Sequence, residues 1–431
     1  SRGKNENIEF KTMLKLKDKL ISSILPLQNT SGLLIIGVDD NANVVGIPEN
    51  QLKELTTTLT SIIKQYNDLA DINYEVLTIS GKEVVVVSAN KVERLEFDFF
   101  NNLIIKRFKV LRNVEVTNLR RINVFAGANN VGKTTLLEAI YFITQLNHIE
   151  RIVQLQKKRH KQINSNYTQI LNLFDDFTEI TAYQKNNKKI THRLNQVDDI
   201  EAKNKAKNYQ KTVQLLAQYN GTELKASAHF YTGKSPEYSK SKINTLCDAE
   251  FSTPFAPLSQ NEWINLYSRN VKNQSYKEVV DFIRKKIASD IENILMTKTD
   301  GSDTLTVLYK DEKTEPLHLL GDGTQRIFEI TMRFALAQNG VVLIDEIESA
   351  IHFELLQDFA KLIYELSVEF NVQVFIVSHS MEAIRAFFDK NLDLESISGY
   401  HLTKKNNQIV ANYEQGRYFS RLIEKFGADL R

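Results

Sequence analysis

The stretch AGANNVGKTTLLEAI, from Ala126 to Ile140, begins at the end of the apolar run INVFA and decides the fold. It matches the pattern GxxxxGK[ST], in which glycines let backbone N–H groups turn inward around an anion. The helix that follows adds the positive end of its dipole. The sequence therefore predicts a strand, a phosphate-binding loop and a helix, which could serve a metabolic kinase, a motor or a nucleotide-driven switch.

The residues of this loop have expected roles in holding a nucleotide. Lys133 should reach the β- and γ-phosphates, and Thr134 should offer its hydroxyl to Mg²⁺. ATP and Mg²⁺ are the predicted cofactors, although these residues do not distinguish ATP from GTP. The residues predicted to bind the nucleotide are Gly127, Asn129, Asn130, Val131, Gly132, Lys133, Thr134 and Thr135.

A second motif, GVVLIDEIESAIH, runs from Gly340 to His352. Its apolar run is typical of a strand buried on both faces of a parallel sheet, and such sheets bind ligands where their strands end. Asp345 is therefore predicted to hold Mg²⁺, and Glu346 to act as the general base for an attacking water. Adjacent carboxylates favour hydrolysis over a kinase. Glu348 could equally form a surface salt bridge, and His352 could be an ordinary residue of a helix face.

Two further motifs follow the same logic. VQVFIVSHS, Val372 to Ser380, predicts another buried strand, which ends near His379. We expect His379 to sense the γ-phosphate rather than to be a structural histidine. LLGDGTQRIFEI places a glycine-rich turn before a helix and predicts a second anion-binding helix N-terminus. Because the phosphate loop already provides one, the second is expected to serve a nucleotide on a neighbouring subunit.

Composition is that of an ordinary globular protein. The 431 residues carry a formal net charge of +2, with 42% hydrophobic and 25% charged residues. No apolar run approaches the ~20 residues of a membrane span, so no membrane partner is expected. The single cysteine, Cys247, cannot form an internal disulfide, and no secretory signal is visible. These features predict a cytoplasmic protein.

Changes in pattern divide the chain near residue 95. Residues 1–95 alternate helical stretches with short β-rich runs and predict a small α/β domain. Residues 96–431 predict a larger α/β domain with a helical insertion at about 150–310. Within the insertion, QKNNKKITHRLNQVDDIEAKNKAKNYQK (184–211) favours a solvated helical arm or surface loop. Its basic excess leaves a nucleic-acid contact as the alternative.

The phosphate loop, a long insertion, GDGTQR, LIDEIE and SHS occur in the order found in ABC-type ATPases. Residues 102–431 resemble the SMC, RecF and Rad50 class, most of all the branch of OLD-family (overcoming lysogenization defect) ATPases and their relatives in bacterial anti-phage systems. The resemblance implies a homo-oligomer, at least a dimer of heads that encloses two ATP molecules. The residues it places against the other subunit's γ-phosphate are Gly321, Asp322, Gly323 and Thr324.

The chain departs from these relatives at three points. The serine common in the GDGT motif is replaced, with Thr324 the nearest hydroxyl. The glutamine of the Q-loop cannot be assigned, and Gln169 is one weak candidate. OLD-family nucleases carry a Toprim domain after the ATPase, for which the roughly fifty residues beyond His379 are too few. We therefore expect any nuclease or toxin to be a separate partner protein or the N-terminal domain.

The N-terminal domain resembles the Schlafen-type AlbA domain through NIEFK, NTSGLLIIGVDDNANVVGI and KEVVVVSAN. In nucleolytic Schlafens three carboxylates bind metal. Here Glu9 matches one, and Asp39 or Asp40 matches another. Lys4 stands five residues before Glu9, and a lysine there removes a ligand, which favours a binding or assembly module over an active nuclease.

These expectations combine into an ATP-driven switch in anti-phage defence that controls a separately encoded effector. This last step follows from the family resemblance and not from residues. One alternative is a DNA-binding repair ATPase of the RecF or Rad50 type. The other is a Schlafen-like RNase regulated by its ATPase, so a nucleic-acid partner stays open.

Overall fold

The computed structural model shows an α/β chain made of two compact units, residues 1–94 with 241–244 and residues 95–240 with 245–431. None of the helices it describes is long and apolar enough to cross a bilayer. The residues described are 8–12, 17–27, 32–66, 71–90, 93–159, 167–239, 243–254, 258–299, 302–349, 351–405, 408–416 and 418–419.

The smaller unit is a four-stranded sheet with two helices. The strand order is β1-β2-β4-β3, with β1 and β2 parallel and the other pairs antiparallel. Leucine, isoleucine and valine side chains of the helices and of β2 and β4 form its core. Its elements are β1 (Ile8–Lys11), α1 (Lys17–Leu27), β2 (Gly32–Ile36), α2 (Glu49–Tyr66), β3 (Asp71–Ile79) and β4 (Lys82–Asn90).

The larger unit is built around a six-stranded sheet of order β15-β19-β20-β8-β21-β22. All neighbouring pairs are parallel except β21 and β22. Its strands are β8 (Ile122–Ala126), β15 (Ala249–Ser252), β19 (Val341–Asp345), β20 (Gln373–Val377), β21 (Ile397–Lys405) and β22 (Gln408–Gln415). The second and third apolar motifs of the sequence thus form β19 and β20, as predicted.

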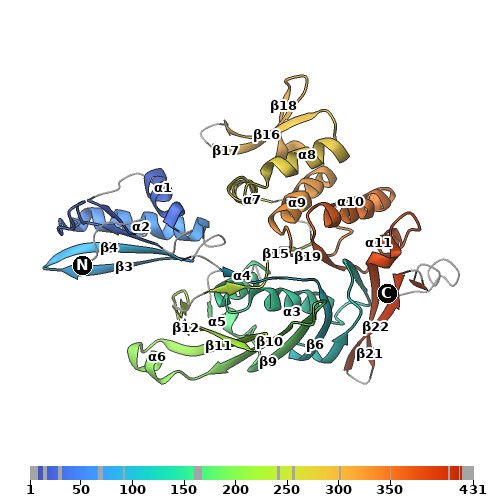
Figure 1. Cartoon of the computed structure of the whole chain (residues 1–431), viewed down its shortest axis with the longest axis horizontal. Helices are drawn as coiled ribbons and strands as arrows, with labels where there is room; N and C mark the ends of the chain where they lie inside the picture. The colour runs from blue at the N-terminus through green and yellow to red at the C-terminus, as the bar shows by residue number, and fades with distance from the viewer. Residues whose placement is uncertain are drawn as a thin grey trace. The chain divides into compact units, whose positions relative to one another are not determined.

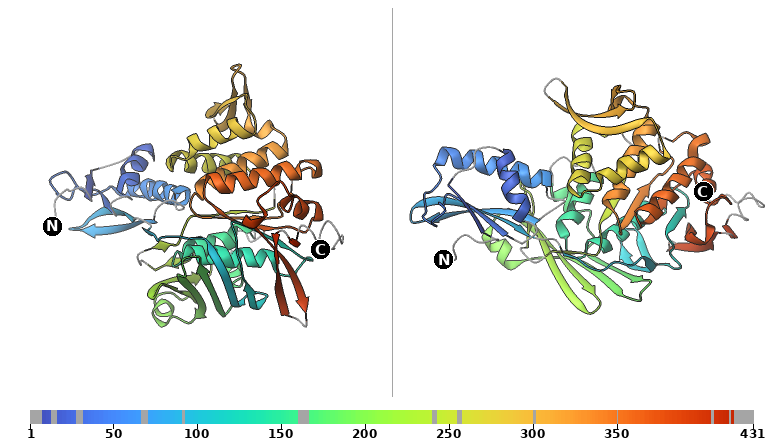
Figure 2. Two further views of the ribbon diagram at one scale, coloured as in Figure 1. Left: turned by 45° about the vertical axis from the view of Figure 1, so that its right-hand side comes forward. Right: turned by 45° about the horizontal axis from the view of Figure 1, so that its top comes forward.

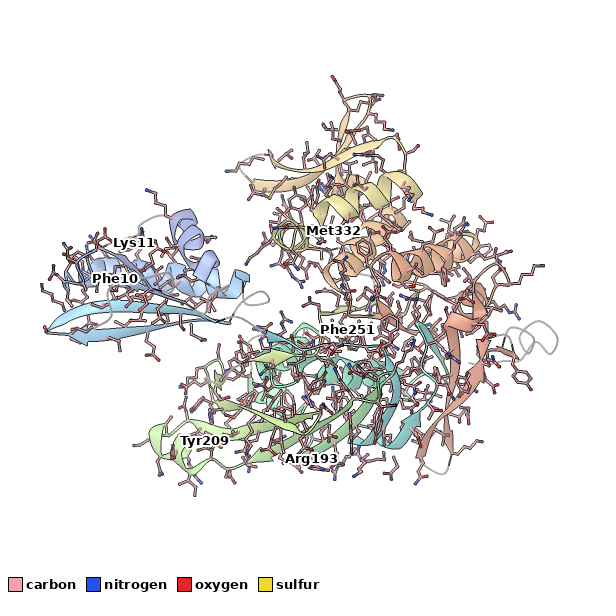
Figure 3. The ribbon with its side chains drawn as sticks, viewed as in Figure 1. Phe10, Lys11, Arg193, Tyr209, Phe251 and Met332 are labelled. Atoms are coloured by element: carbon pink, nitrogen blue, oxygen red, sulfur yellow. The ribbon has the colours of Figure 1, made fainter. Side chains whose placement is uncertain are left out.

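Alternate residues of the central strands face two different cores. Phe125, Leu343 and Phe375 pack on one side, whereas Val124 and Ile344 pack on the other. This explains why β8, β19 and β20 are apolar at nearly every position instead of every second one. Figure 3 marks the two sides, with Phe251 on β15 packed against the first core and Met332 of α9 (Asp322–Leu336) inside the second.

The first core lies between the parallel sheet and a seven-stranded antiparallel sheet, with α3 (Lys133–Gln145) enclosed between them (Figure 1). The antiparallel order is β13-β12-β11-β10-β9-β6-β7. Its strands are β6 (Phe100–Phe108), β7 (Leu111–Val116), β9 (Phe177–Gln184), β10 (Lys189–Val197), β11 (Tyr209–Tyr219), β12 (Thr222–Tyr231) and β13 (Glu237–Tyr238). The short helices beside it are α4 (Ile149–Arg159), α5 (Tyr167–Leu171) and α6 (Ile200–Lys205).

Helices cover the other face of the parallel sheet, and a small three-stranded sheet stands beyond them (Figure 2). The helices are α7 (Gln260–Lys272), α8 (Tyr276–Lys286), α9, α10 (Leu356–Glu369) and α11 (Met381–Phe387). The small sheet is β16 (Ile291–Thr299), β17 (Ser302–Tyr309) and β18 (Thr314–Pro316). Short 3₁₀ turns are η1 (Leu317–Leu319), η2 (Phe353–Leu355) and η3 (Leu394–Ser396), and β5 (Glu93–Arg94) pairs with β14 (Asn244–Thr245).

The prediction of a helical insertion at 150–310 is wrong for much of that segment. Residues 184–211, expected as a helical arm or loop, contribute β10 and the start of β11, with α6 as a short helix between them. Ile190, His192 and Leu194 are almost fully buried on one face of β10, whereas Thr191 and Arg193 lie on the other face, where Thr191 is buried and Arg193 is half-buried. The two faces of a strand accept apolar and polar residues in turn, so strand pairing prevails over the polar, lysine-rich composition of this segment.

Candidate functional site

Three neighbouring parallel strands end at the same edge of the six-stranded sheet and carry the nucleotide motifs. β8 leads into the phosphate loop, β19 ends at Asp345, and β20 ends just before Ser378 and His379. β20 lies between β19 and β8. Because parallel strands place their carboxyl ends together, motifs more than 200 residues apart in sequence meet at this edge.

The backbone of the phosphate loop has left-handed residues that need glycine. Gly127 has φ 145° and Gly132 has φ 83°. A Cβ at Gly127 would lie 2.5 Å from the carbonyl oxygen of Leu402 in β21, and one at Gly132 would lie 2.8 Å from the Leu111 side chain. The loop is therefore held closely against β21 and the β6–β7 hairpin, and a side chain at either glycine would displace it.

The loop residues differ in exposure. Asn129 and Asn130 are exposed, Thr134 and Thr135 are half-buried, and Val131 is buried. Asn130 also has a positive φ of 64°, which asparagine tolerates better than most residues.

Lys133 is the first residue of α3 and is buried beneath the loop. Its Nζ donates hydrogen bonds to the carbonyl oxygens of Gly127, at 2.7 Å, and Ala128, at 2.9 Å. Burial lowers the pKa of Lys133, and the nearby carboxylates of Asp345, Glu348 and Glu346 oppose that shift. The ammonium thus sits where its charge can meet a phosphate, within the field of three carboxylates.

Thr134 and Asp345 bring two hard oxygen atoms together. The Thr134 hydroxyl donates a hydrogen bond of 3.0 Å to Asp345 Oδ1, and Asp345 is 3% exposed. Hydroxyl and carboxylate oxygens are the ligands that Mg²⁺ prefers, so this pair fits the predicted metal. The next residue, Glu346, has a left-handed φ of 50°, unusual for a residue with a side chain. Its carboxylate has no hydrogen-bond or ion-pair partner within the described part of the chain.

Glu348 connects the end of β19 with the end of β20. Its Oε2 accepts a hydrogen bond of 2.8 Å from the Ser378 hydroxyl, and its Oε1 accepts one of 3.2 Å from the His379 backbone N–H. The same Oε1 lies 3.2 Å from His379 Nδ1. Sequence reasoning left Glu348 undecided and did not single out Ser378, which is fully buried. The signal in the sequence that could have identified Glu348 is its position three residues after Asp345.

The GDGT motif begins α9, which packs on the opposite face of the sheet from α3. Gly321 precedes the first helical residue, and a Cβ there would meet no atom within 4 Å. Gly321 and Asp322 are exposed, while Gly323 and Thr324 are half-buried. A helix therefore begins at this motif, as predicted, and its N-terminus is accessible. Anion binding there stays a prediction.

A buried ionic network fixes α9 to the edge strand β15. Arg326 Nη1 donates to the Ser252 hydroxyl at 2.7 Å and pairs with Glu329 at 3.0 Å. Arg333 pairs with Glu329 at 2.7 Å and with Glu250 of β15 at 3.1 Å. Because β15 runs beside β19, the network connects the GDGT helix to the strand next to Asp345.

Two weaker candidates make no hydrogen bond or ion pair with the strand-end residues within the described part of the chain. His352 is exposed and its ring lies 3.7 Å from Glu354. Gln169 is an exposed residue of α5, a helix that packs on β11 and β12. In the smaller unit, Glu9 pairs with Lys11 at 2.9 Å. Lys4 lies outside the described residues.

Asp39 organises a turn in the smaller unit. Its carboxylate accepts hydrogen bonds from the backbone N–H groups of Asn41, at 2.9 Å, and Asn43, at 2.8 Å. The Asn43 side-chain amide donates a third bond of 3.0 Å, and these contacts hold the pKa of Asp39 below its usual value. A turn-capping role accounts for this residue.

Comparison with protein families agrees with this geometry. Residues 173–385, which include Asp345, Glu346 and His379, match the model of an AAA domain described as a putative AbiEii toxin of a type IV toxin–antitoxin system. The chain carries an AAA-type ATPase domain. Residues 4–109 match the model of the Schlafen AlbA family, so the N-terminal part of the chain is an AlbA-type domain. The AAA match begins after the phosphate loop, so the loop of this ATPase domain is recognised from its own sequence and geometry.

Two curated proteins are similar to parts of the chain. An ATP/GTP phosphatase of Helicobacter pylori is 21% identical over 327 residues, covering 65% of this chain and 85% of the relative. An uncharacterized protein of Methanocaldococcus jannaschii is 26% identical over 114 residues, covering 26% of this chain and 99% of the relative.

Solved structures of SMC heads are similar to this chain at low sequence identity. The SMC head of Thermotoga maritima has a TM-score of 0.34 at 13% identity, covering 73% of this chain and 99% of that one. The Smc head with an extended coiled coil bound to ScpA of Pyrococcus furiosus has a TM-score of 0.40 at 12% identity, covering 77% and 100%.

Proposed function

We propose that this chain is an ATP-hydrolysing molecular switch whose general base is Glu346. The observation that carries the proposal is the hydrogen bond of 3.0 Å between Thr134 and Asp345, which joins the phosphate loop to the end of β19, directly before Glu346. The name of the H. pylori relative, an ATP/GTP phosphatase, supports the same chemistry.

The residues at the strand ends divide the work of hydrolysis. Lys133 and the loop N–H groups would bind the β- and γ-phosphates, and Thr134 with Asp345 would hold Mg²⁺. When bound, Mg²⁺ would neutralise negative charge on the phosphates. Glu346 would take a proton from the attacking water, and His379 would contact the γ-phosphate.

The switch step is an ATP-dependent pairing of two heads. The GDGT helix lies on the opposite face of the sheet from the phosphate-loop helix, which supports its serving a nucleotide on another subunit. Large apolar side chains are exposed shortly before the GDGT motif, at Leu319 (63%), and directly after the motif that ends at His352, at Phe353 (63%) and Leu355 (54%). Exposed apolar groups of this kind favour a protein interface.

The setting we propose is bacterial anti-phage defence in the cytoplasm, with the ATPase holding and releasing a separately encoded nuclease or toxin. The matched family description, which names a putative toxin of a type IV system, supports a link to a toxic effector. The Schlafen AlbA part would then bind the effector or a nucleic acid.

The test compares Glu346→Gln with the parent chain, with neighbouring gene products co-expressed. We expect ATP turnover to fall by about 10²-fold or more, because the base is lost while the phosphate loop is kept. Bound ATP should be retained and native mass should show paired heads. Glu237→Gln is the matched control, since Glu237 is a carboxylate of β13 whose side chain is 58% accessible.

Three results would contradict the proposal in different ways. Undiminished turnover in Glu346→Gln would show that Glu346 is not the base. Lost turnover with co-purified DNA and no protein partner would favour a repair ATPase. RNA cleavage by the parent chain that Glu9→Ala abolishes would favour an RNase.

A further inference from the structure

Glu348 is placed so that one carboxylate holds both the backbone and the ring of His379. The backbone N–H of His379 donates to Oε1 at 3.2 Å, and Nδ1 of the ring lies 3.2 Å from the same oxygen. The other oxygen, Oε2, accepts from the Ser378 hydroxyl at 2.8 Å. Both carboxylate oxygens are therefore engaged with the residues that follow β20.

The residues that hold His379 are mostly buried, whereas the His379 ring itself is accessible to solvent. The Glu348 side chain is 17% exposed and Ser378 is fully buried, whereas the His379 side chain is 46% exposed. Ser378 is fixed further, because its hydroxyl accepts the backbone N–H of Ser380 at 3.0 Å. The imidazole thus projects from a rigid base.

The contact between the Glu348 carboxylate and the His379 ring determines which ring nitrogen carries the hydrogen. A carboxylate only accepts hydrogen bonds, so its position beside Nδ1 favours a hydrogen on Nδ1. Nε2 is then the ring nitrogen that is available to another partner. Glu348 also lies in the same turn as Glu346, where the Ser349 N–H donates to the Glu346 carbonyl oxygen at 3.0 Å.

We propose that Glu348 is a positioning residue that fixes the ring orientation and tautomer of His379 and couples the His379 loop to the turn that carries Glu346. The inference rests on the proposed hydrolytic function. It implies that Glu346 and His379 stay at a fixed distance from each other, because the Glu348 carboxylate connects the turn of Glu346 with the loop of His379.

The test is a double-mutant cycle on the full chain, measuring kcat, KM and ATP affinity. Glu348→Ala should lower kcat by about 10²-fold, as small misplacements of reacting groups do, while ATP affinity and KM stay nearly unchanged. Glu348→Gln should recover most of kcat, because its amide oxygen can still accept from His379. In the His379→Ala background, Glu348→Ala should lower kcat by much less than in the parent, because only the contacts with the Ser378 hydroxyl and the residue 379 backbone remain to be lost.

Glu382→Ala is the matched control. Glu382 also contacts this loop, through the Ser380 hydroxyl at 2.9 Å, and we expect its removal to leave kcat unchanged. Multiplicative effects of Glu348→Ala and His379→Ala would overturn the positioning role, as would normal kcat in Glu348→Ala. Failure of the hydrolytic proposal is seen separately, as undiminished turnover in Glu346→Gln.

Discussion

Glu346 holds a left-handed backbone conformation that costs a residue with a side chain about 1–2 kcal/mol. Such strain persists at functional positions, because the surrounding structure imposes it. Here the strain turns the chain directly after Asp345, which places two consecutive carboxylates in different surroundings. Asp345 is buried against Thr134, while Glu346 is half-exposed.

Glu346→Gly should therefore stabilise the protein while it abolishes ATP turnover. Glycine relieves the left-handed strain, and its greater freedom in the unfolded chain offsets part of the gain, so we expect up to about 1 kcal/mol in the free energy of unfolding. Urea denaturation measures this change. Glu346→Gln, which keeps the strain, should unfold at the parent's midpoint. A less stable glycine variant would contradict the strain argument.

The positions of Lys133, Thr134 and Asp345 at one sheet edge could be predicted from the sequence, because a loop or a buried strand fixes each of them locally. Their roles in hydrolysis stay predictions. The contacts of Glu348 could not be assigned, since they depend on the distance between two turns that are 30 residues apart in the chain.

At the scale of elements, the end of α3 depends on a histidine of the antiparallel sheet. His192 of β10 is fully buried and its Nε2 lies 2.6 Å from the carbonyl oxygen of Leu146, the residue that caps the C-terminus of α3. Burial lowers the pKa of His192 to about 4, although the bond to Leu146 opposes the shift. The folded protein thus keeps this ring neutral.

Stability should therefore fall as pH decreases from 6.5 to about 4. In this window the unfolded chain binds a proton at His192 and the folded chain does not, which destabilises the fold by up to about 3 kcal/mol. Unfolding free energies measured across this range in His192→Gln should show a shallower slope. His352→Gln serves as control, because that side chain is 62% exposed. Equal slopes in parent and His192→Gln would refute this account.

The prediction for the 150–310 segment failed at this scale. The alternation of Ile190, His192 and Leu194 was readable, but it competed with a composition rich in lysine and asparagine. The pairing that decides the structure is non-local, because β9 joins β6 across an intervening segment of the chain that contains the whole phosphate loop. A single sequence carries no signal for such a pairing.

At the scale of the whole molecule, all residues assigned to hydrolysis belong to the unit of residues 95–240 and 245–431. A chain that starts at residue 95 should therefore fold and hydrolyse ATP within about a factor of three of the parent, as expected for independent parts. Circular dichroism and kcat measure the two properties. Glu346→Gln in the shortened chain is the control for contaminating activity. Native spectra with lost turnover would show that residues 1–94 contribute to catalysis.

The order of strands in the six-stranded sheet has a consequence for synthesis on the ribosome. β8 pairs with β20 and β21, so Phe125 meets Val377 and Tyr400. At about 5–20 residues per second, roughly 250 residues must be added after β8 before either partner exists, a delay on the order of 10–50 s. During that time both edges of a strand of five apolar or buried residues lack their neighbours. The nascent chain is therefore expected to need a chaperone at this stage, and a slower ribosome would lengthen the exposure.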